Sequence, residues 1–300
     1  MNIIITRFSL VALLLLGTAA GVAHAGETCG CDVAPERLAA YDAALVATDL
    51  EAARARHAPY GVAVPARPGP PLIELAQAGW LTGYDPVRRM PAWVAYRMTA
   101  SDVAQKRKRT QCFRPDPRLS VAQGGTACAS WRGDGMDRGH MVASADMTRS
   151  EQAMVNTYVF SNIAHQYPGF NRTLWRDLEI RVRAMARLRG EIYVMSGAVF
   201  DHDHDGRPDD AARAPVPRIS GRPAAAVASH FYKIVIVPGR DGAAPEISAW
   251  LLRHENVRTT RQQSKRLLVQ SRVPLDIIEQ LSGLDIAPAL NGRRLADMRP

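Results

Sequence analysis

The sequence lacks most of the patterns that would assign it to a membrane or to a common hydrolase class. Beyond its first 25 residues, no apolar run is long enough to span a bilayer, so we expect no transmembrane helix. It has no HExxH, Gly-x-Ser-x-Gly or phosphate-loop pattern, so the corresponding metalloproteases, serine hydrolases and nucleotide hydrolases have no support. Internal repeats and low-complexity tracts are missing too. These absences indicate a globular protein of ordinary hydrophobicity.

The one long apolar run stands at the start of the chain. Arg7 precedes the run FSLVALLLLGTAAGVA, and Ala23 and Ala25 occupy the small-residue positions that a signal peptidase recognises. No cysteine follows in the context that lipid attachment needs. Residues 1 to 25 are therefore interpreted as a cleaved signal peptide, which predicts a periplasmic or secreted protein whose mature chain begins near Gly26.

Cysteine is scarce, with four residues in the whole chain. An oxidising compartment favours disulfides over thiolate metal sites. We expect a disulfide between Cys112 and Cys128, which would close a loop of about 15 residues and contribute roughly 3 kcal/mol. Cys29 and Cys31 are left to pair with each other or with another partner.

Basic residues exceed acidic ones, and the formal net charge is +9. This excess suits a polyanionic partner, while an Arg-rich composition can also reflect genome bias. The basic run QKRKRTQCFR, residues 105 to 114, is either a strip that contacts phosphates or a solvated surface loop. Charge alone does not choose between these interpretations.

Hydrophobic periodicity predicts an α+β fold with a central mixed or antiparallel sheet flanked by helices. We divide the mature chain into an N-terminal helical extension and linker, residues 26 to 69, and one domain, residues 70 to 300. Helices are expected at residues 34–59, as one helix or a pair, and at 171–190 and 273–284. Strands are expected at residues 79–85, 93–99, 157–163, 190–200, 230–237 and 247–252.

The helix expected at residues 171–190 carries a row of polar side chains. Asn171, Trp175, Glu179 and Arg183 are each four residues apart, so an amide, a carboxylate and a guanidinium share one face. A neighbouring row at core spacing is formed by Leu178, Val182 and Met185. This pattern is typical of a helix with one buried flank and one polar flank facing a groove, although Glu179 and Arg183 alone would equally suit a surface ion pair.

Several of these residues fall into an order that resembles a known family. The chain has DRGH at residues 137–140, SNI at 161–163, and then Asn171, Trp175, LE at 178–179 and Arg183. This arrangement resembles the DNA/RNA non-specific endonucleases, which are ββα-metal (His-Me finger) nucleases and include secreted nucleases and mitochondrial endonuclease G. The resemblance covers roughly residues 57 to 290 and implies a ββα-metal nuclease domain that hydrolyses phosphodiester bonds in DNA and RNA.

The chemistry of hydrolysis suggests a role for His140. A neutral imidazole can accept a proton near neutral pH, which makes His140 the expected general base. We expect Gly139 to permit a tight turn, so that the ring can approach a phosphate. The resemblance implies a backbone carbonyl near Asn162 that fixes the tautomer of the ring. The family's usual His-Leu-Ala-Pro is replaced here by HMVAS, residues 140–144.

The resemblance also implies a metal site and phosphate contacts. Asn171 stands at the position of the direct ligand to Mg²⁺, which Mn²⁺ can replace, and Glu179 would hold metal-bound waters. Arg138 and Arg183 are placed to pair with phosphate oxygens, and Arg109 is a candidate for a further phosphate contact. Asp137 and Asp146 are interpreted as orienting or structural residues.

Contacts to sugar and phosphate predict weak sequence preference and action on both DNA and RNA. Two alternatives stay open. One is a non-catalytic protein of the same fold that binds nucleic acid or another polyanion. The other is a zinc hydrolase that uses four of the histidines, namely His140, His165, His202 and His204.

A separate acidic stretch, DHDHDGRPDD at residues 201 to 210, has the spacing of a calcium-binding loop. Its candidate ligands are Asp201, Asp203, Asp205 and Asp209, with Gly206 at the turn. The twelfth position is Ala212 where such loops usually have Glu. The stretch is therefore either a structural Ca²⁺ site or a hydrated acidic loop.

Overall fold

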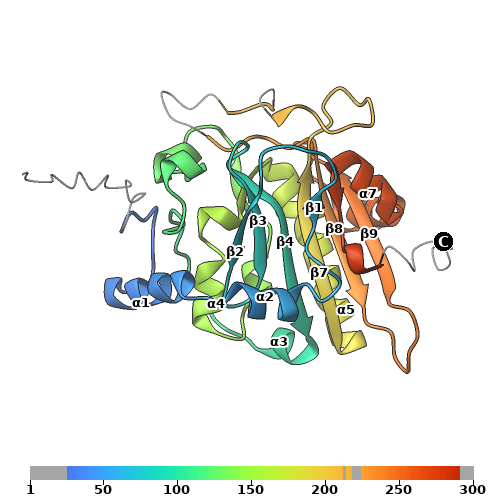
Figure 1. Ribbon diagram of the computed structural model, residues 1–300, viewed down its shortest axis with the longest axis horizontal. Coiled ribbons are helices and arrows are strands. Elements are labelled where there is room, and N and C mark those ends of the chain that lie inside the picture. Colours follow the sequence, from blue (N-terminus) through green and yellow to red (C-terminus); the bar gives the residue numbers. More distant parts are fainter. Residues whose placement is uncertain (1–25, 212–213, 218–223, 291–300) are drawn as a thin grey trace, which may run out of the picture.

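The computed structural model describes residues 26–211, 214–217 and 224–290, so the predicted signal peptide at residues 1 to 25 lies outside the described residues. A six-stranded sheet forms the centre of the molecule (Figure 1), with strand order β2-β3-β4-β7-β8-β9. Every neighbouring pair in it is antiparallel. Its strands are β2 (Ile73–Ala76), β3 (Leu81–Asp85), β4 (Met90–Thr99), β7 (Glu191–Val199), β8 (His230–Val237) and β9 (Glu246–Arg253).

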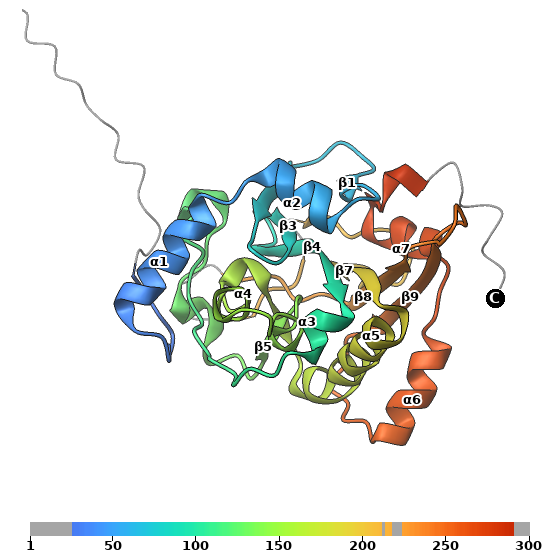
Figure 2. The ribbon, with the colours of Figure 1, turned by 90° about the horizontal axis from the view of Figure 1, so that it is seen from below.

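Helices cover both faces of this sheet (Figure 2). On one face lie α2 (Leu50–His57) and α7 (Leu275–Ser282), whose apolar side chains share a core with Trp93, Met195 and Ile234. A second core lies on the other face, and its helices are α3 (Ala100–Ala104), α4 (Glu151–Asn156), α5 (Arg176–Arg189) and α6 (Arg261–Gln270). The α+β prediction is confirmed, since both faces of the sheet need apolar cover.

Five of the six predicted strands form, because their β-branched and aromatic residues are buried in the sheet. The exception is residues 157–163, where a turn at Phe160–Asn162 precedes a short strand. There the Asn162 side chain donates to the carbonyls of Thr157 and Val142, and these bonds hold a local turn. The predicted strand is wrong because this amide competes with ladder pairing.

Of the two forms expected for residues 34–59, one helix or a pair, the N-terminal extension forms the pair, α1 (Pro35–Val46) and α2. Asp49 separates them, because its side chain accepts from the Glu51 and Ala52 amides and caps α2. Within the predicted linker, β1 (Val64–Pro65) pairs with β10 (Leu284–Asp285). The extension is therefore attached to the C-terminal part of the domain, while the boundary at residue 70 stays a prediction.

The disulfide prediction is wrong. Cys29 is bonded to Cys128, and Cys31 is bonded to Cys112. Sequence distance favoured the short loop between Cys112 and Cys128, but the backbone of the extension lies beside the 111–113 segment: the amide of Cys29 donates to the Phe113 carbonyl at 2.7 Å. Both bonds therefore tie the extension to the domain.

No helix within the described ranges is long and apolar enough to cross a membrane.

Candidate active site

The DRGH residues belong to a small unit of two strands and a helix. β5 (Asp137–His140) pairs antiparallel with β6 (Ile163–Gln166), and Arg138 lies opposite His165. A π-helical segment, Phe170–Trp175, follows β6 and continues directly into α5. The predicted helix at residues 171–190 thus forms and ends before Gly190, but its first turn is wider than an α-helix. Such π segments often occur at functional sites.

Two contacts join the start of this helix to β5. The Asn171 amide nitrogen donates to Asp137 Oδ2 at 2.9 Å, and the Trp175 indole donates to the His140 carbonyl at 3.2 Å. Arg172 also pairs with the Asp137 carboxylate. Asn171, which lies 31 positions after His140 in the chain, is therefore bound at one end of the four-residue strand β5, and His140 is the residue at the other end.

Gly139 serves a different purpose from the predicted turn. It lies within β5, opposite Ala164, and its φ angle is not in the positive region. A Cβ atom at this position would lie 2.2 Å from Oε1 of the buried Gln166 side chain. The prediction of a tight turn is wrong, and the glycine is required by the close approach of this side chain.

The His140 imidazole is packed between aromatic rings. Its centroid lies 4.7 Å from the ring of Tyr158 and 5.6 Å from that of Phe113. Its Nε2 atom is buried and has no hydrogen-bond partner among the described residues. Burial, followed by the nearby charges of Arg109 and Arg138, lowers the pKa of His140 to about 3. The free imidazole is therefore neutral at physiological pH, with an unpaired nitrogen available to a ligand.

Asn162 supports the chain on the far side of His140. Its carbonyl accepts from the Met141 amide at 3.0 Å, and its side-chain oxygen accepts from the Val142 amide at 2.9 Å. Asn162 is buried and holds the backbone that follows His140. The implied contact between its carbonyl and the imidazole ring is not among the bonds formed by the described residues.

Two arginines lie beside the imidazole. The Arg138 guanidinium carbon stands 4.2 Å from the centre of the Phe113 ring, and its Nη1 is buried without a partner among the described residues. Arg109 donates to the Tyr158 hydroxyl, and its guanidinium lies over the Tyr158 ring. Since both arginine charges act on His140, the structure brings Arg138 and Arg109 to one site.

Glu179 and Arg183 lie on α5. They belong to a largely buried group of charges that also contains Asp146 and Lys233. Arg183 donates to one oxygen of Asp146 at 2.7 Å, and Tyr96 donates to the other at 2.7 Å. Burial raises the pKa of Glu179, and the positive charge of Lys233 opposes that rise. Arg183 is thus committed on one side to Asp146, whose role is structural as expected.

Lys233 is the member of this group that the sequence analysis missed. Its ammonium is fully buried, donates to the Ser196 hydroxyl at 2.6 Å and lies 4.5 Å from the centre of the Trp175 ring. Burial lowers its pKa, while the Glu179 charge favours the protonated form. A single cation inside the otherwise apolar strand HFYKIVIV was the signal that could have identified it.

The donor set suits a hard divalent cation. Because the Asn171 amide nitrogen is engaged by Asp137, its oxygen is oriented away from that carboxylate, and no described residue donates to it. The Glu179 carboxylate on the same helix likewise accepts no hydrogen bond from the described residues, and is balanced by charge alone. An amide oxygen and a carboxylate are ligands that Mg²⁺ and Mn²⁺ accept.

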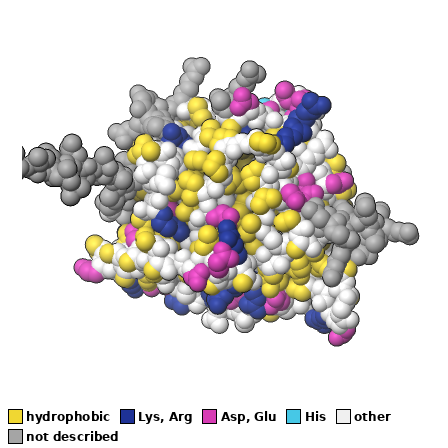
Figure 3. All heavy atoms as spheres, viewed as in Figure 1, with side chains coloured by type: hydrophobic (Ala, Val, Ile, Leu, Met, Phe, Trp, Pro, Cys, Tyr) yellow, Lys and Arg dark blue, Asp and Glu magenta, His cyan; other side chains and the backbone are white. Residues whose placement is uncertain are grey.

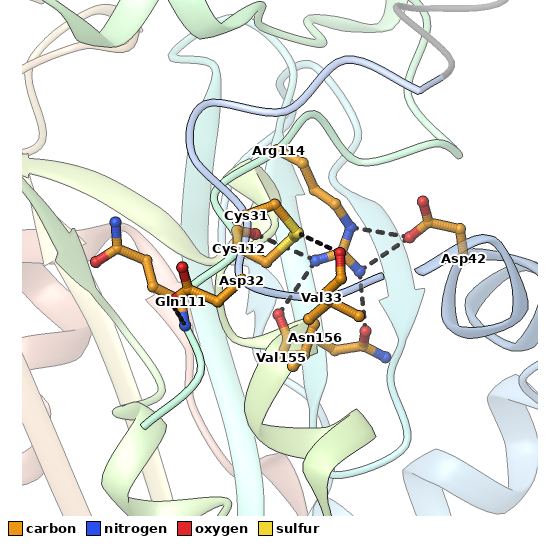
Figure 4. Close-up of a disulfide and its surroundings, with 9 residues drawn as sticks. All are labelled: Cys31, Asp32, Val33, Asp42, Gln111, Cys112, Arg114, Val155 and Asn156. Atoms are coloured by element: carbon orange, nitrogen blue, oxygen red, sulfur yellow. Dashed lines mark hydrogen bonds and ion pairs between the residues drawn. A yellow bond between two sulfur atoms is a disulfide. The ribbon is translucent and has the colours of Figure 1, made fainter. Parts of the chain in front are cut away.

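Part of the basic run at residues 105–114 is structural. Arg114 is fully buried, and its guanidinium pairs with Asp42 of α1 at 2.9 Å (Figure 4). It also donates to the Val155 carbonyl and to Asn156 Oδ1. The interpretation of the whole run as a phosphate strip is wrong at Arg114, whereas most of residues 105–111 are exposed.

The four histidines of the zinc alternative do not form a ligand cluster among the described residues. His165 is buried, stacks on Trp131 and pairs with Asp134 at 2.8 Å, whereas His202 pairs with Asp209. Among the described residues, three or more candidate ligands converge only at Asp201, Asp203 and Asp209, and His140 belongs to no such set. Asp205 of the predicted calcium loop lies outside that set.

The opposite face of the molecule looks different. Figure 3 views the side on which α2 lies, and shows hydrophobic side chains over much of it, with basic and acidic groups interspersed. On this side, α2 carries Arg54, which pairs with Glu51 and Glu74. The unpaired basic atoms described above are found instead at β5, on the other side of the sheet.

Comparison with known proteins agrees with this geometry. Residues 77–292 match the family model of the DNA/RNA non-specific endonucleases. Mitochondrial nuclease EXOG of Danio rerio is 30% identical over 72% of this chain and 61% of its own length. Mitochondrial endonuclease G of Homo sapiens is 29% identical, over 75% and 73%. Nuclease C1 of Cunninghamella echinulata is 28% identical, over 77% and 89%.

A solved structure supports the fold. The chain in a crystal structure of an EndoG/EndoGI complex aligns with a TM-score of 0.64 at 24% identity, covering 79% of this chain and 92% of that one. At this identity the likeness bears on the fold alone.

The relatives correct one prediction and establish the family. The predicted periplasmic or secreted location is contradicted, because the similar nucleases of Danio rerio, Homo sapiens and Schizosaccharomyces pombe are mitochondrial. The family assignment rests on a match over more than two thirds of the chain and on the ββα unit that carries His140 and Asn171. This chain belongs to the DNA/RNA non-specific endonuclease family.

Proposed function

We propose that this protein is a divalent-metal-dependent nuclease that cleaves phosphodiester bonds within DNA and RNA strands without sequence selection. One observation carries the proposal: β5 ends in His140 and binds the Asn171 amide through Asp137 at its other end, while Trp175, in the same helical segment as Asn171, donates to the His140 carbonyl. A base and a metal ligand held by one short strand can act on the same phosphate.

His140 is the proposed general base. Its neutral ring has a buried, unpaired Nε2, which would take the proton from the attacking water. A pKa of about 3 in the free protein makes this a weak base. The negative charge of a bound phosphate favours the protonated imidazole and so raises that pKa when substrate is present.

Asn171 and Glu179 would hold the cation, Asn171 directly and Glu179 through water. The bound ion would supply charge neutralisation at the phosphate and the leaving oxygen. Because Asn171 is a neutral ligand, the ion would keep its full double charge toward the substrate. The contact from Asp137 fixes which end of the amide faces outward.

The arginines would bind the phosphate itself. Arg138 and Arg109 lie beside His140, and Arg138 Nη1 has no partner among the described residues. Arg183 has one side occupied by Asp146, so we assign it a weaker phosphate contact. All of these groups recognise backbone charge, which supports cleavage of both nucleic acids and an affinity that falls with salt.

The test is digestion of supercoiled plasmid and single-stranded RNA by the purified protein, first with EDTA and then with Mg²⁺ or Mn²⁺. We expect no cleavage with EDTA and cleavage of both substrates when either cation is restored. His140→Ala should lower the rate about 10²- to 10⁴-fold with an unchanged circular dichroism spectrum. The exposed His204 offers the matched control, His204→Ala, which should cleave at the normal rate.

Binding without cleavage in the wild-type protein at every metal concentration would contradict the proposal. It would favour the non-catalytic polyanion-binding alternative. Restoration of cleavage by Zn²⁺ and not by Mg²⁺ or Mn²⁺ would contradict the assigned metal chemistry.

A further inference from the structure

A second group of carboxylates lies in the loop that follows β7, and its residues are separate from those of the proposed nuclease site. Asp201, Asp203 and Asp209 each present a carboxylate oxygen, and these three oxygens lie within 4.8 Å of one another. Asp205, which the spacing of the loop had included, is not part of this set, and its side chain accepts from the Arg207 amide at 2.8 Å.

Asp201 is the unusual member of this group. The residue is only 5% exposed, and its Oδ1 is buried with no hydrogen-bond partner among the described residues. A buried carboxylate oxygen without a partner is costly, and buried charges are normally paired or bound to metal. The bond that Asp201 does form involves its backbone, whose amide donates to the Ser229 hydroxyl at 2.8 Å.

The surroundings leave the negative charge of this group largely uncompensated. No lysine or arginine among the described residues forms an ion pair with Asp201, Asp203 or Asp209. The nearest guanidinium contact is to the backbone, where Arg88 donates to the Asp209 carbonyl at 2.8 Å. The Nδ1 atom of His202 lies 2.7 Å from Asp209 Oδ2. The three carboxylates therefore converge without a lysine or arginine partner among the described residues.

We propose that Asp201, Asp203 and Asp209 form a structural site for one divalent cation of the Ca²⁺ class. Ca²⁺ takes six to eight oxygen ligands in flexible geometry, so three carboxylates can be completed by backbone carbonyls and water. Mg²⁺ demands a near-ideal octahedron and dehydrates reluctantly, which an irregular, partly exposed loop serves less well. An all-oxygen set also disfavours Zn²⁺, although His202 offers one nitrogen nearby.

A cation here would fasten the end of β7 to the loop that carries Asp209. The two segments already meet where the Asp209 amide donates to the Phe200 carbonyl at 2.7 Å. Since Asp201 follows Phe200 directly, metal binding would reinforce this closure. Ca²⁺ should therefore raise the melting temperature of the whole protein, independently of its nuclease activity.

The test is a calorimetric titration of the metal-stripped full chain with CaCl₂, in a buffer containing excess Mg²⁺ to occupy the nuclease site. We expect one Ca²⁺ per chain, together with a rise in melting temperature. Asp201→Asn and Asp203→Asn should each weaken binding about 10- to 100-fold or more. Asp203 is exposed, so its variant remains informative if Asp201→Asn folds poorly.

Two controls separate this site from its alternatives. Asp205→Asn should bind Ca²⁺ as the wild type does, because Asp205 lies outside the cluster. Asn171→Ala, which removes the ligand of the proposed nuclease site, should also retain the Ca²⁺ site.

Absence of Ca²⁺ binding at millimolar concentration would overturn the proposal. An equal loss of Ca²⁺ affinity in Asp205→Asn would also overturn it, because it would indicate general attraction of cations to an acidic loop. Loss of Ca²⁺ binding in Asn171→Ala would overturn it as well. Tighter binding of Zn²⁺ that depends on His202 would replace the calcium assignment with a transition-metal site.

Discussion

Two arginines, Arg114 next to Phe113 in the chain and Arg138 over the Phe113 ring, differ in how their guanidinium nitrogens are bonded. The Arg114 guanidinium donates hydrogen bonds to Asp42, to the Val155 carbonyl and to Asn156 (Figure 4). Arg138 keeps a buried nitrogen without a partner among the described residues. His140 does the same with its Nε2.

The difference separates a structural charge from one available to a ligand. A saturated buried cation stabilises the fold it helps to build, and it has no remaining capacity for substrate. Unpaired buried atoms cost stability unless something else supplies the missing bonds. Removing Arg114 should therefore affect folding, and removing Arg138 should affect catalysis.

The largest expected effect on folding comes from Arg114, whose guanidinium is bonded on all sides. Arg114→Leu would leave Asp42 and Asn156 facing an apolar side chain. We expect the free energy of unfolding to fall by about 3–5 kcal/mol, because one partner of a buried pair is removed. Urea denaturation monitored by circular dichroism measures this loss, and activity per folded molecule should not change.

The matched control is Arg189→Ala, which removes an exposed ion pair with Glu246. It should cost less than about 1 kcal/mol. Equal losses in the two variants would remove the distinction between a buried and a surface pair.

The opposite result is expected for Arg138, whose Nη1 has no partner among the described residues. Arg138→Ala should lower kcat/KM for plasmid cleavage about 10²- to 10³-fold, as for loss of one donor to a developing charge. Its melting temperature should stay close to that of the wild type. Arg176→Ala, an exposed arginine on the same helix as Glu179, serves as the control and should retain nearly full activity. An inactive Arg138→Ala variant that is also unfolded would contradict the distinction between structural and catalytic arginines.

A smaller effect is expected from acid. His57 is buried, and its Nδ1 accepts from the Arg97 amide, so folding requires the neutral ring. Burial lowers the pKa of His57 to about 3. Because the unfolded value is higher, near 6.5, the folded state binds fewer protons between these values. The contribution of His57 is complete above about pH 6.5 and is lost as the pH falls toward 3.

Between pH 7 and pH 5 this loss amounts to about 2 kcal/mol. Denaturant titrations of wild type and His57→Gln at both pH values measure it. The variant should lose about 2 kcal/mol less than the wild type over that interval, whereas His204→Gln, at an exposed position, should match the wild type. Identical pH dependence in wild type and His57→Gln would show that His57 is not buried in the neutral form.

The sequence predicted what periodicity and local chemistry determine. The strands at residues 230–237 and 247–252 and the helix before Gly190 follow from β-branched runs and 3.6-residue spacing. The order of DRGH, SNI and Asn171 identified the family, because this order carries the ββα unit. The sequence left open whether residues 34–59 form one helix or a pair, and Asp49, which caps α2, accounts for the pair.

What the sequence could not give depends on contacts between distant segments. The pairing of Cys31 with Cys112 follows from the path of the extension across the domain, which no local pattern encodes. Gly139 was misread because the side chain that excludes a Cβ belongs to another strand. Lys233 and Arg114 were missed or misassigned for the same reason: burial of a charge is visible only with its partners in place.

The most direct test of the central claim is a double-mutant cycle between His140 and Asn171, measured as the plasmid cleavage rate at saturating Mg²⁺. If both residues act on one phosphate from the two ends of β5, the variant carrying His140→Ala and Asn171→Ala should be little slower than the slower single variant. Rate losses that multiply in full would contradict the account, since they would mean that the two residues act independently.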